Sequence, residues 1–160
     1  MIRSMKLFVR VVTTVCAVFW MVLIFSFSAQ PDTESAQVSS GVSYRLVSGI
    51  DQILQLEKSE QELKEAAVSI EFPVRKIAHM SEFAILFLLL LGMFFAYGNT
   101  KHAFKYAFWL TVFYAATDEF HQLFVPGRAG RIMDVLIDSA GAFFALLAAG
   151  LIIKKLYRKR

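Results

Sequence analysis

The chain has 160 residues, of which 57% are hydrophobic, with a formal net charge of +4 and a single cysteine, Cys16. A soluble domain of ordinary composition is roughly 45–50% apolar, so the composition argues against a soluble globule. The 16 Phe, 5 Tyr and 2 Trp argue against disorder. The length predicts one domain, residues 1–160. A lone cysteine excludes an intrachain disulfide and a CxxC zinc site.

Four apolar segments follow one another along the chain. A helix needs about 20 apolar residues to cross a bilayer, and residues 11–31 and 83–100 satisfy this without a single charge. The runs 106–117 and 139–153 reach that length only when ionisable residues are admitted. We therefore predict an all-α membrane protein, an antiparallel bundle of four transmembrane helices at about residues 9–29, 77–98, 103–124 and 132–153.

The first segment has one alternative interpretation. Arg3, Lys6 and Arg10 precede it, as basic residues precede the apolar core of a cleaved signal peptide. Such a core is typically about 7–15 residues long, whereas this one is longer, and no A-x-A cleavage site occurs near Ala29. A membrane span is the better prediction.

Basic residues divide unevenly between the two sides of such a bundle. Ten of them lie at the amino end, between the second and third segments and at the carboxyl end, where there is no acid. The positive-inside rule then places both termini in the cytoplasm. The pI of about 9.3 follows from this topology, and nucleic acid is not needed to explain it. The ten residues are Arg3, Lys6, Arg10, Lys101, Lys105, Lys154, Lys155, Arg158, Lys159 and Arg160.

The long outer loop, residues 32–74, contains two helical patterns. An amphipathic helix is predicted from about Glu34 to Gln55, lying at the outer membrane interface. A second, charged helix is predicted over Glu57–Val68, ended by Pro73. The alternative is an ordinary solvated loop. The apolar positions of the first helix are Val38, Val42, Leu46, Ile50, Ile53 and Leu54.

Polar residues gather at the outer ends of the segments. Each ionisable group is costly inside a membrane and is by default a functional hypothesis. On the fourth segment, Asp134 and Asp138 share a helical face with Gly141, Ala145 and Ala149, small residues that allow close helix packing. The other members are Ser26, Ser28 and Gln30, then Arg75, Lys76, His79 and Glu82, then Asp118, Glu119, His121 and Gln122, and finally Arg128 and Arg131 in the Pro126–Gly127 turn.

This polar cluster fits several kinds of chemistry. It could be a structural ion-pair network, in which the acids pair with Lys76, His79, Arg128 or Arg131. It could also bind phosphate, transfer protons through a histidine and a carboxylate, or hold a divalent ion. His79, Asp118 and Glu119 are the catalytic candidates. The sequence contains no HExxH, GxSxG, P-loop or GxGxxG motif, and it assigns no metal or cofactor. Cys16 lies away from the cluster, which excludes cysteine catalysis.

Four motifs together resemble the VanZ-like family. They cover nearly the whole chain apart from the termini and residues 32–71. Each motif is loose by itself, but their order on four apolar segments is specific. They are Ser26-x-Ser28-x-Gln30-Pro31, Arg75-Lys76-x-x-His79-x-x-Glu82-Phe83, Asp118-Glu119-x-x-Gln122-x-Phe124-x-Pro126-Gly127-Arg128 and Asp134-x-x-x-Asp138-x-x-Gly141.

The resemblance implies a single VanZ-like membrane domain in the bacterial cytoplasmic (inner) membrane. The family is named after an accessory protein of glycopeptide-resistance gene clusters that lowers susceptibility to teicoplanin. Asp138 departs from the family pattern, in which Asn is expected, and this adds an acid to the cluster. The family's polar positions correspond here to Lys76, His79, Glu82, Asp118, Glu119, Gln122, Arg128, Asp134 and Asp138.

We expect the outer polar residues to form a pocket for an anionic lipid or a lipid-linked cell-wall precursor. Lys76, Arg128 and Arg131 would hold phosphate, while the acids would orient them and contact hydroxyl groups. The alternative is a lipid-phosphate or phospholipid hydrolase or transferase, with His79 or a carboxylate as base. An ion or proton pathway is disfavoured, because the cytoplasmic halves of the second and fourth segments are almost purely apolar. The sequence does not indicate an oligomeric state.

Overall fold

The computed structural model describes residues 2–158. Met1, Lys159 and Arg160 lie outside the described residues, and with them the last two bases predicted to be cytoplasmic. The described part of the chain contains five α-helices and no strand, which confirms the all-α fold class. The helices are α1 (Ile2–Ser28), α2 (Asp32–Leu54), α3 (Glu60–Ala96), α4 (Ala103–Gln122) and α5 (Ile132–Tyr157).

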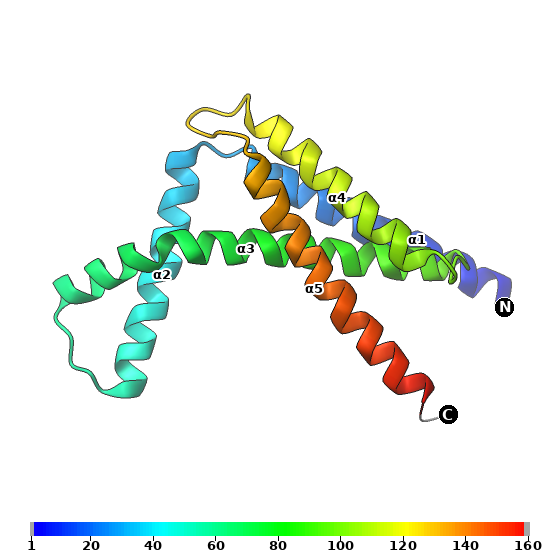
Figure 1. Cartoon of the computed structure of the whole chain (residues 1–160), viewed down its shortest axis with the longest axis horizontal. Coiled ribbons are helices and arrows are strands. Elements are labelled where there is room, and N and C mark those ends of the chain that lie inside the picture. Colours follow the sequence, from blue (N-terminus) through cyan, green and yellow to red (C-terminus); the bar gives the residue numbers. More distant parts are fainter. Residues whose placement is uncertain (1, 159–160) are drawn as a thin grey trace.

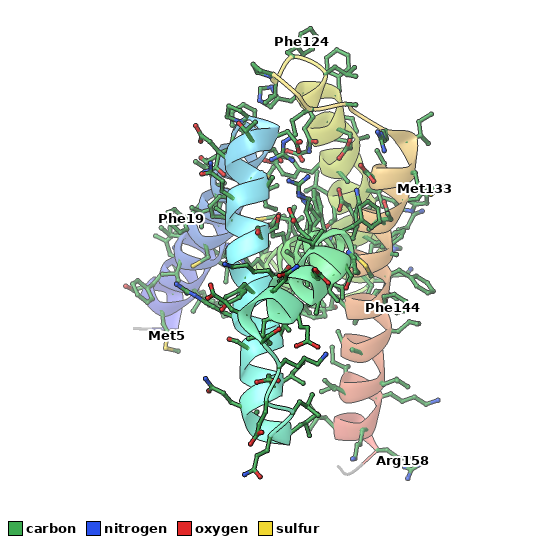
Figure 2. All side chains as sticks on the ribbon, turned by 90° about the vertical axis from the view of Figure 1, so that its left-hand side faces the viewer. Met5, Phe19, Phe124, Met133, Phe144 and Arg158 are labelled. Atoms are coloured by element: carbon green, nitrogen blue, oxygen red, sulfur yellow. The ribbon has the colours of Figure 1, made fainter. Side chains whose placement is uncertain are left out.

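Three of the helices found in residues 2–158, namely α1, α3 and α5, are long and apolar enough to cross a membrane. Many large side chains of α1 and α5 point outward, as Phe19 and Phe144 do in Figure 2, with 60% and 59% of their surface exposed. Such surfaces need an apolar surrounding, so these helices indicate a membrane protein. Helix α3 instead supplies most of the large buried side chains of the core. The shorter α4 carries Lys105, Asp118 and Glu119. A role for α4 as a fourth span stays a prediction.

Helix α3 occupies the centre of the molecule and packs against each of the other four helices. Figure 1 shows α1 and α4 running along one side of it, while α5 crosses it and α2 crosses nearer its amino end. Both ends of the chain and the α3–α4 connection lie toward one end of the molecule. The α1–α2 and α4–α5 connections lie near each other at the top of the view, away from both termini. The predicted antiparallel bundle of four spans stays a prediction, since three of the described helices meet the length and hydropathy of a span.

Small residues let the helices approach one another closely. In α4, Ala103, Ala107, Thr111 and Ala115 recur every fourth residue and are fully buried. In α5, a β-carbon at Gly141 would collide with the backbone carbonyl of Met80 in α3. The predicted small-residue face of the last helix is therefore the face that packs on α3.

The predicted amphipathic helix of the outer loop is α2, which runs from Asp32 to Leu54 without interruption at Gly41 or Gly49. It buries Ser39 and Ser43 toward the protein, while its apolar stripe is exposed. This is the reverse of a helix packed on a soluble core. The exposed residues are Val38, Val42, Leu46, Ile50, Ile53 and Leu54.

The predicted helix Glu57–Val68 was wrong at both ends. Helix α3 begins after Ser59, whose side chain and that of Glu62 form a capping box. It continues through Pro73 to Ala96. Proline removes one helical hydrogen bond and tends to kink a helix, and Figure 1 shows α3 bending in its first part, beside α2. Packing against neighbouring helices along its length keeps α3 continuous.

Candidate functional site

A polar cavity of about 230 Å³ lies between the first turn of α2, the middle of α3, the end of α4 and the start of α5. The turn that joins α4 to α5 completes its wall. Seven of the nine predicted positions line it; Glu82 and Asp118 do not. We call this cavity the polar pocket. Its polar lining consists of Asp32, Arg75, Lys76, His79, Glu119, Gln122, Arg128, Arg131, Asp134 and Asp138.

Lys76 and Asp134 form an ion pair across the pocket wall. The Lys76 ammonium donates to Asp134 Oδ1 at 2.5 Å, and each side chain is only 20% exposed. Lys76 comes from α3 and Asp134 from the first turn of α5, so the pair joins these two helices. Asp134 thus has one of the cationic partners that the sequence predicted.

Arg75 and Asp32 form a second ion pair, at 2.9 Å, between α3 and the first turn of α2. Sequence reasoning placed Arg75 in the polar cluster but left it out of the predicted binding positions, and it missed Asp32 altogether. The position of Asp32 directly after Pro31, near the start of the predicted helix, could have identified it. A negative side chain there interacts favourably with the positive end of the helix dipole.

Arg128 does not pair with Asp118. Its guanidinium instead donates to the carbonyls of Gln30 at 3.2 Å and Phe27 at 3.4 Å, where α1 ends. Within residues 2–158, no carboxylate lies in ion-pair distance of Arg128. Burial, together with the nearby charge of Arg75, lowers the pKa of Arg128 below its ordinary value. The nearby charges of Asp32, Asp118 and Glu119 act in the opposite direction and offset part of this effect.

Glu119 accepts a hydrogen bond from the backbone N–H of Arg131 at 2.9 Å. The α4–α5 turn folds tightly onto α4 at this point, since a β-carbon at Gly130 would collide with the carbonyl of Glu119. Arg131 is exposed, and its guanidinium makes no hydrogen bond or ion pair in the described part of the chain. It lines the polar pocket as a free cation.

Asp118 lies behind the pocket wall. It is 2% exposed, and its Oδ2 accepts from the Ser28 hydroxyl at 2.6 Å and from the Gln122 amide at 3.2 Å. Its Oδ1 is buried without a hydrogen-bond partner. Asp118 therefore joins α4 to the end of α1 and positions Gln122, which does line the pocket.

Asp138 is the acid in the pocket without a partner. It is 2% exposed as a residue and lines the cavity. Its carboxylate makes no hydrogen bond or ion pair within the described chain. A buried carboxylate normally has hydrogen-bond partners, so Asp138 is an acceptor that a ligand in the pocket can use.

The histidines lie in different places. His79 lines the polar pocket, and its Nδ1 is 3.6 Å from Oε2 of Glu82, one helical turn further along α3. His121 is not part of the pocket lining; its ring stacks on Phe25 of α1, with 4.3 Å between ring centroids. Among residues 2–158, no group of three or more His, Cys, Asp or Glu side chains could hold a metal ion.

Together, the helices and the polar pocket define an all-helical membrane protein with a charged cavity between its helix ends. The sequence model of the VanZ/LLP1 family matches residues 13–153. The chain belongs to the VanZ/LLP1 family, which confirms the resemblance drawn from the four motifs. No curated protein and no solved structure matches the chain.

Proposed function

We propose that this protein is a four-span protein of the bacterial cytoplasmic membrane with both termini in the cytoplasm. In this orientation the polar pocket opens at the outer leaflet, since the end of α4 and the start of α5 line it and their connection lies away from both termini (Figure 1). Helix α2 then lies at the outer interface, where its exposed Val38, Val42 and Leu46 meet lipid. The charge distribution supports this orientation, because the basic residues of the other end have no acidic neighbours.

The ligand of the pocket is the anionic headgroup of a lipid or of a lipid-linked cell-wall precursor. One observation carries this proposal: Arg128 and Arg131 line the pocket, and neither makes an ion pair in the described chain. Arginine binds phosphate oxygens through charge-assisted, often bidentate, hydrogen bonds. A phosphate would also compensate the buried charge of Arg128. Lys76 donates one of its three ammonium hydrogens to Asp134, which offsets its charge. The remaining hydrogens can still donate to a phosphate oxygen.

The acids of the pocket give the ligand a second set of contacts. Asp138 and Glu119 face the cavity and can accept hydrogen bonds from hydroxyl groups of a glycerol or sugar headgroup. An envelope lipid supplies phosphate and hydroxyl groups together. A role in the envelope also fits the association of the VanZ-like family with teicoplanin resistance.

The arrangement of His79 and Glu82 supports an alternative function in the same pocket. The 3.6 Å between His79 Nδ1 and Glu82 Oε2 is too long for a hydrogen bond. A small side-chain rotation would bring the carboxylate close enough to orient the ring as a general base. Beside a bound phosphate, this pair would suit a lipid-phosphate or phospholipid hydrolase or transferase. Release of phosphate or of a lipid alcohol by the purified protein, lost in His79→Gln, would identify the enzyme.

A deletion strain complemented with near-isosteric variants tests the pocket. We expect Asp138→Asn, Glu119→Gln and His79→Gln to be produced and to melt near the wild-type temperature. We also expect that none of the three corrects the envelope defect of the deletion strain, which the wild-type gene corrects. Glu60→Gln is the matched control, since Glu60 is exposed and pairs only with Lys64. Full complementation by all three pocket variants would mean that the acids are structural.

A direct binding assay uses a water-soluble headgroup, glycerol 3-phosphate, with the purified protein. It should raise the melting temperature of the wild type and not that of Arg131→Gln. This variant is the cleanest one, because the hydrogen bond to Glu119 comes from the backbone of residue 131 and survives the substitution.

A further inference from the structure

A second cavity, which we call the apolar groove, lies beside the polar pocket. It has a volume of about 290 Å³ and lies between the end of α1, the first half of α2 and the middle of α3. Its apolar lining comes from all three helices: Phe27, Val38, Val42, Val74 and Ala78. The sequence predicted apolar residues on α2 but not that they form one wall of a groove.

The two cavities share three residues. Arg75, His79 and Arg128 line both the polar pocket and the apolar groove. A molecule in contact with Arg128 therefore has phosphate-binding groups on one side and hydrocarbon side chains on the other. This juxtaposition fits an amphiphile with an anionic head and an apolar chain.

The groove also borders the surface that faces lipid in the proposed orientation. Val38 and Val42 line the groove and are 63% and 44% exposed. They belong to the apolar stripe of α2, so the wall of the groove continues into a surface suited to the membrane interface.

We infer that the ligand is a long-chain lipid phosphate of the surrounding membrane, with its phosphate in the polar pocket and its hydrocarbon chain in the apolar groove. This inference rests on the proposed function. It adds that the chain is itself recognised and that the lipid passes between α2 and α3. A soluble phosphate would use only the first half of this site.

A series of alkyl phosphates of increasing chain length tests recognition of the chain. The protein is held in nanodiscs of a neutral lipid, and each alkyl phosphate competes with a photoreactive long-chain alkyl phosphate that carries a diazirine in its chain. Each methylene group strengthens partitioning into the bilayer itself about fourfold, so competitor concentrations are expressed per nanodisc lipid. On this scale, competition should still rise with chain length until the groove is filled. Glycerol 3-phosphate should compete weakly.

The positions of crosslinking provide the second measurement. We expect crosslinks on α2 near Val42 and on α3 near Ala78, and we expect Arg131→Gln to abolish them. Ala78→Trp should fill the groove and reduce crosslinking at least tenfold while leaving the glycerol 3-phosphate response intact. Ala148→Trp is the matched control, because Ala148 is also exposed on an apolar helix and lines neither cavity. Val42→Trp blocks the opposite wall if Ala78→Trp does not fold.

The outcomes separate this inference from the proposed function. Glycerol 3-phosphate binding that depends on Arg131, without any effect of chain length or of the groove variants, would overturn the groove and leave the polar pocket. Crosslinks spread evenly over the lipid-facing sides of α1 and α5 would also overturn it. Loss of all phosphate binding, including that of glycerol 3-phosphate, would overturn both.

Discussion

Lys76 and Asp134 bring their charges to within 2.5 Å of each other between α3 and α5. The pair lies in the wall of the polar pocket, one turn of α5 away from the unpaired Asp138. One acid of α5 is thus bound to a cation of the protein, while the next acid remains free for a ligand. This difference separates a paired part of the cluster from the part that we propose binds a ligand, and each part predicts a different response to substitution.

The Lys76–Asp134 pair should show strong coupling in a double-mutant cycle. Lys76→Met and Asp134→Asn should each destabilise the protein, because each leaves a partly buried charge without its partner. The double variant should lose less than the sum, with a coupling energy of about 1–3 kcal/mol. Thermal unfolding in detergent measures all four proteins.

The exposed Lys64–Glu60 pair is the control for this cycle. Its side chains are 64% and 72% exposed, so its coupling should stay below about 0.5 kcal/mol. Equal coupling in the two pairs would contradict a structural role for Lys76 and Asp134. Additivity of the Lys76 and Asp134 variants would contradict it as well.

Ser28→Ala should destabilise the protein by about 1–3 kcal/mol, since it removes the hydroxyl that donates to buried Asp118. Ser26→Ala provides the comparison. The Ser26 hydroxyl is exposed and bonds only to a carbonyl of its own helix, so its loss should change stability little. Chemical denaturation of both variants in the same detergent decides the question, and similar losses would argue against the link between α1 and α4.

Gly141→Ala should force α3 and α5 apart and cost about 1–3 kcal/mol, because the new methyl group would meet the Met80 carbonyl. Gly150→Ala is the matched substitution in the same helix. Its β-carbon meets nothing within 4 Å, and alanine favours a helix over glycine by up to about 1 kcal/mol. Gly150→Ala should therefore be as stable as the wild type or more so. The melting temperatures of the two variants should move in opposite directions or differ clearly.

Cysteine labelling tests the proposed topology in a Cys16→Ser background. A membrane-impermeant maleimide added to intact cells should label Glu60→Cys and Ala129→Cys, because both positions lie at the predicted outer side. His102→Cys and Arg158→Cys should react only after the cells are broken. The reverse pattern would invert the orientation, and labelling at positions 102 and 129 alike would remove α4 as a membrane span.

Much of the architecture follows from local properties of the sequence. Apolar segments of spanning length predicted α1, α3 and α5, and helical spacing predicted that Asp134, Asp138 and Gly141 share one face. The gathering of polar residues at one end was predictable too, because antiparallel helices bring the start of one segment beside the end of the previous one. The seven predicted positions that line one cavity follow from this geometry.

The helix boundaries near Pro73 were not predictable in the same way. Local rules count a proline as a helix end, whereas in α3 the packing on both sides of Pro73 outweighs the loss of one hydrogen bond. The exposure of the apolar face of α2 was predicted from its period. The groove between α2 and α3 was not predictable. Helical periodicity shows which residues share a face of α2, but it does not show where α2 crosses α3.

The composition and spacing of the residues determined by themselves that this protein is helical, that it carries membrane-length segments and that its charges meet at one end. Only the tertiary structure decided which charges are paired. Arg128 donates to the carbonyls at the end of α1 instead of to Asp118, and Asp118 accepts from the Ser28 hydroxyl. The side chains of Arg131 and Asp138 have no partner among residues 2–158. The physical reason is distance: a hydrogen bond requires atoms within about 3 Å, and a shift of one helix by a few ångströms exchanges one partner for another without altering the sequence pattern.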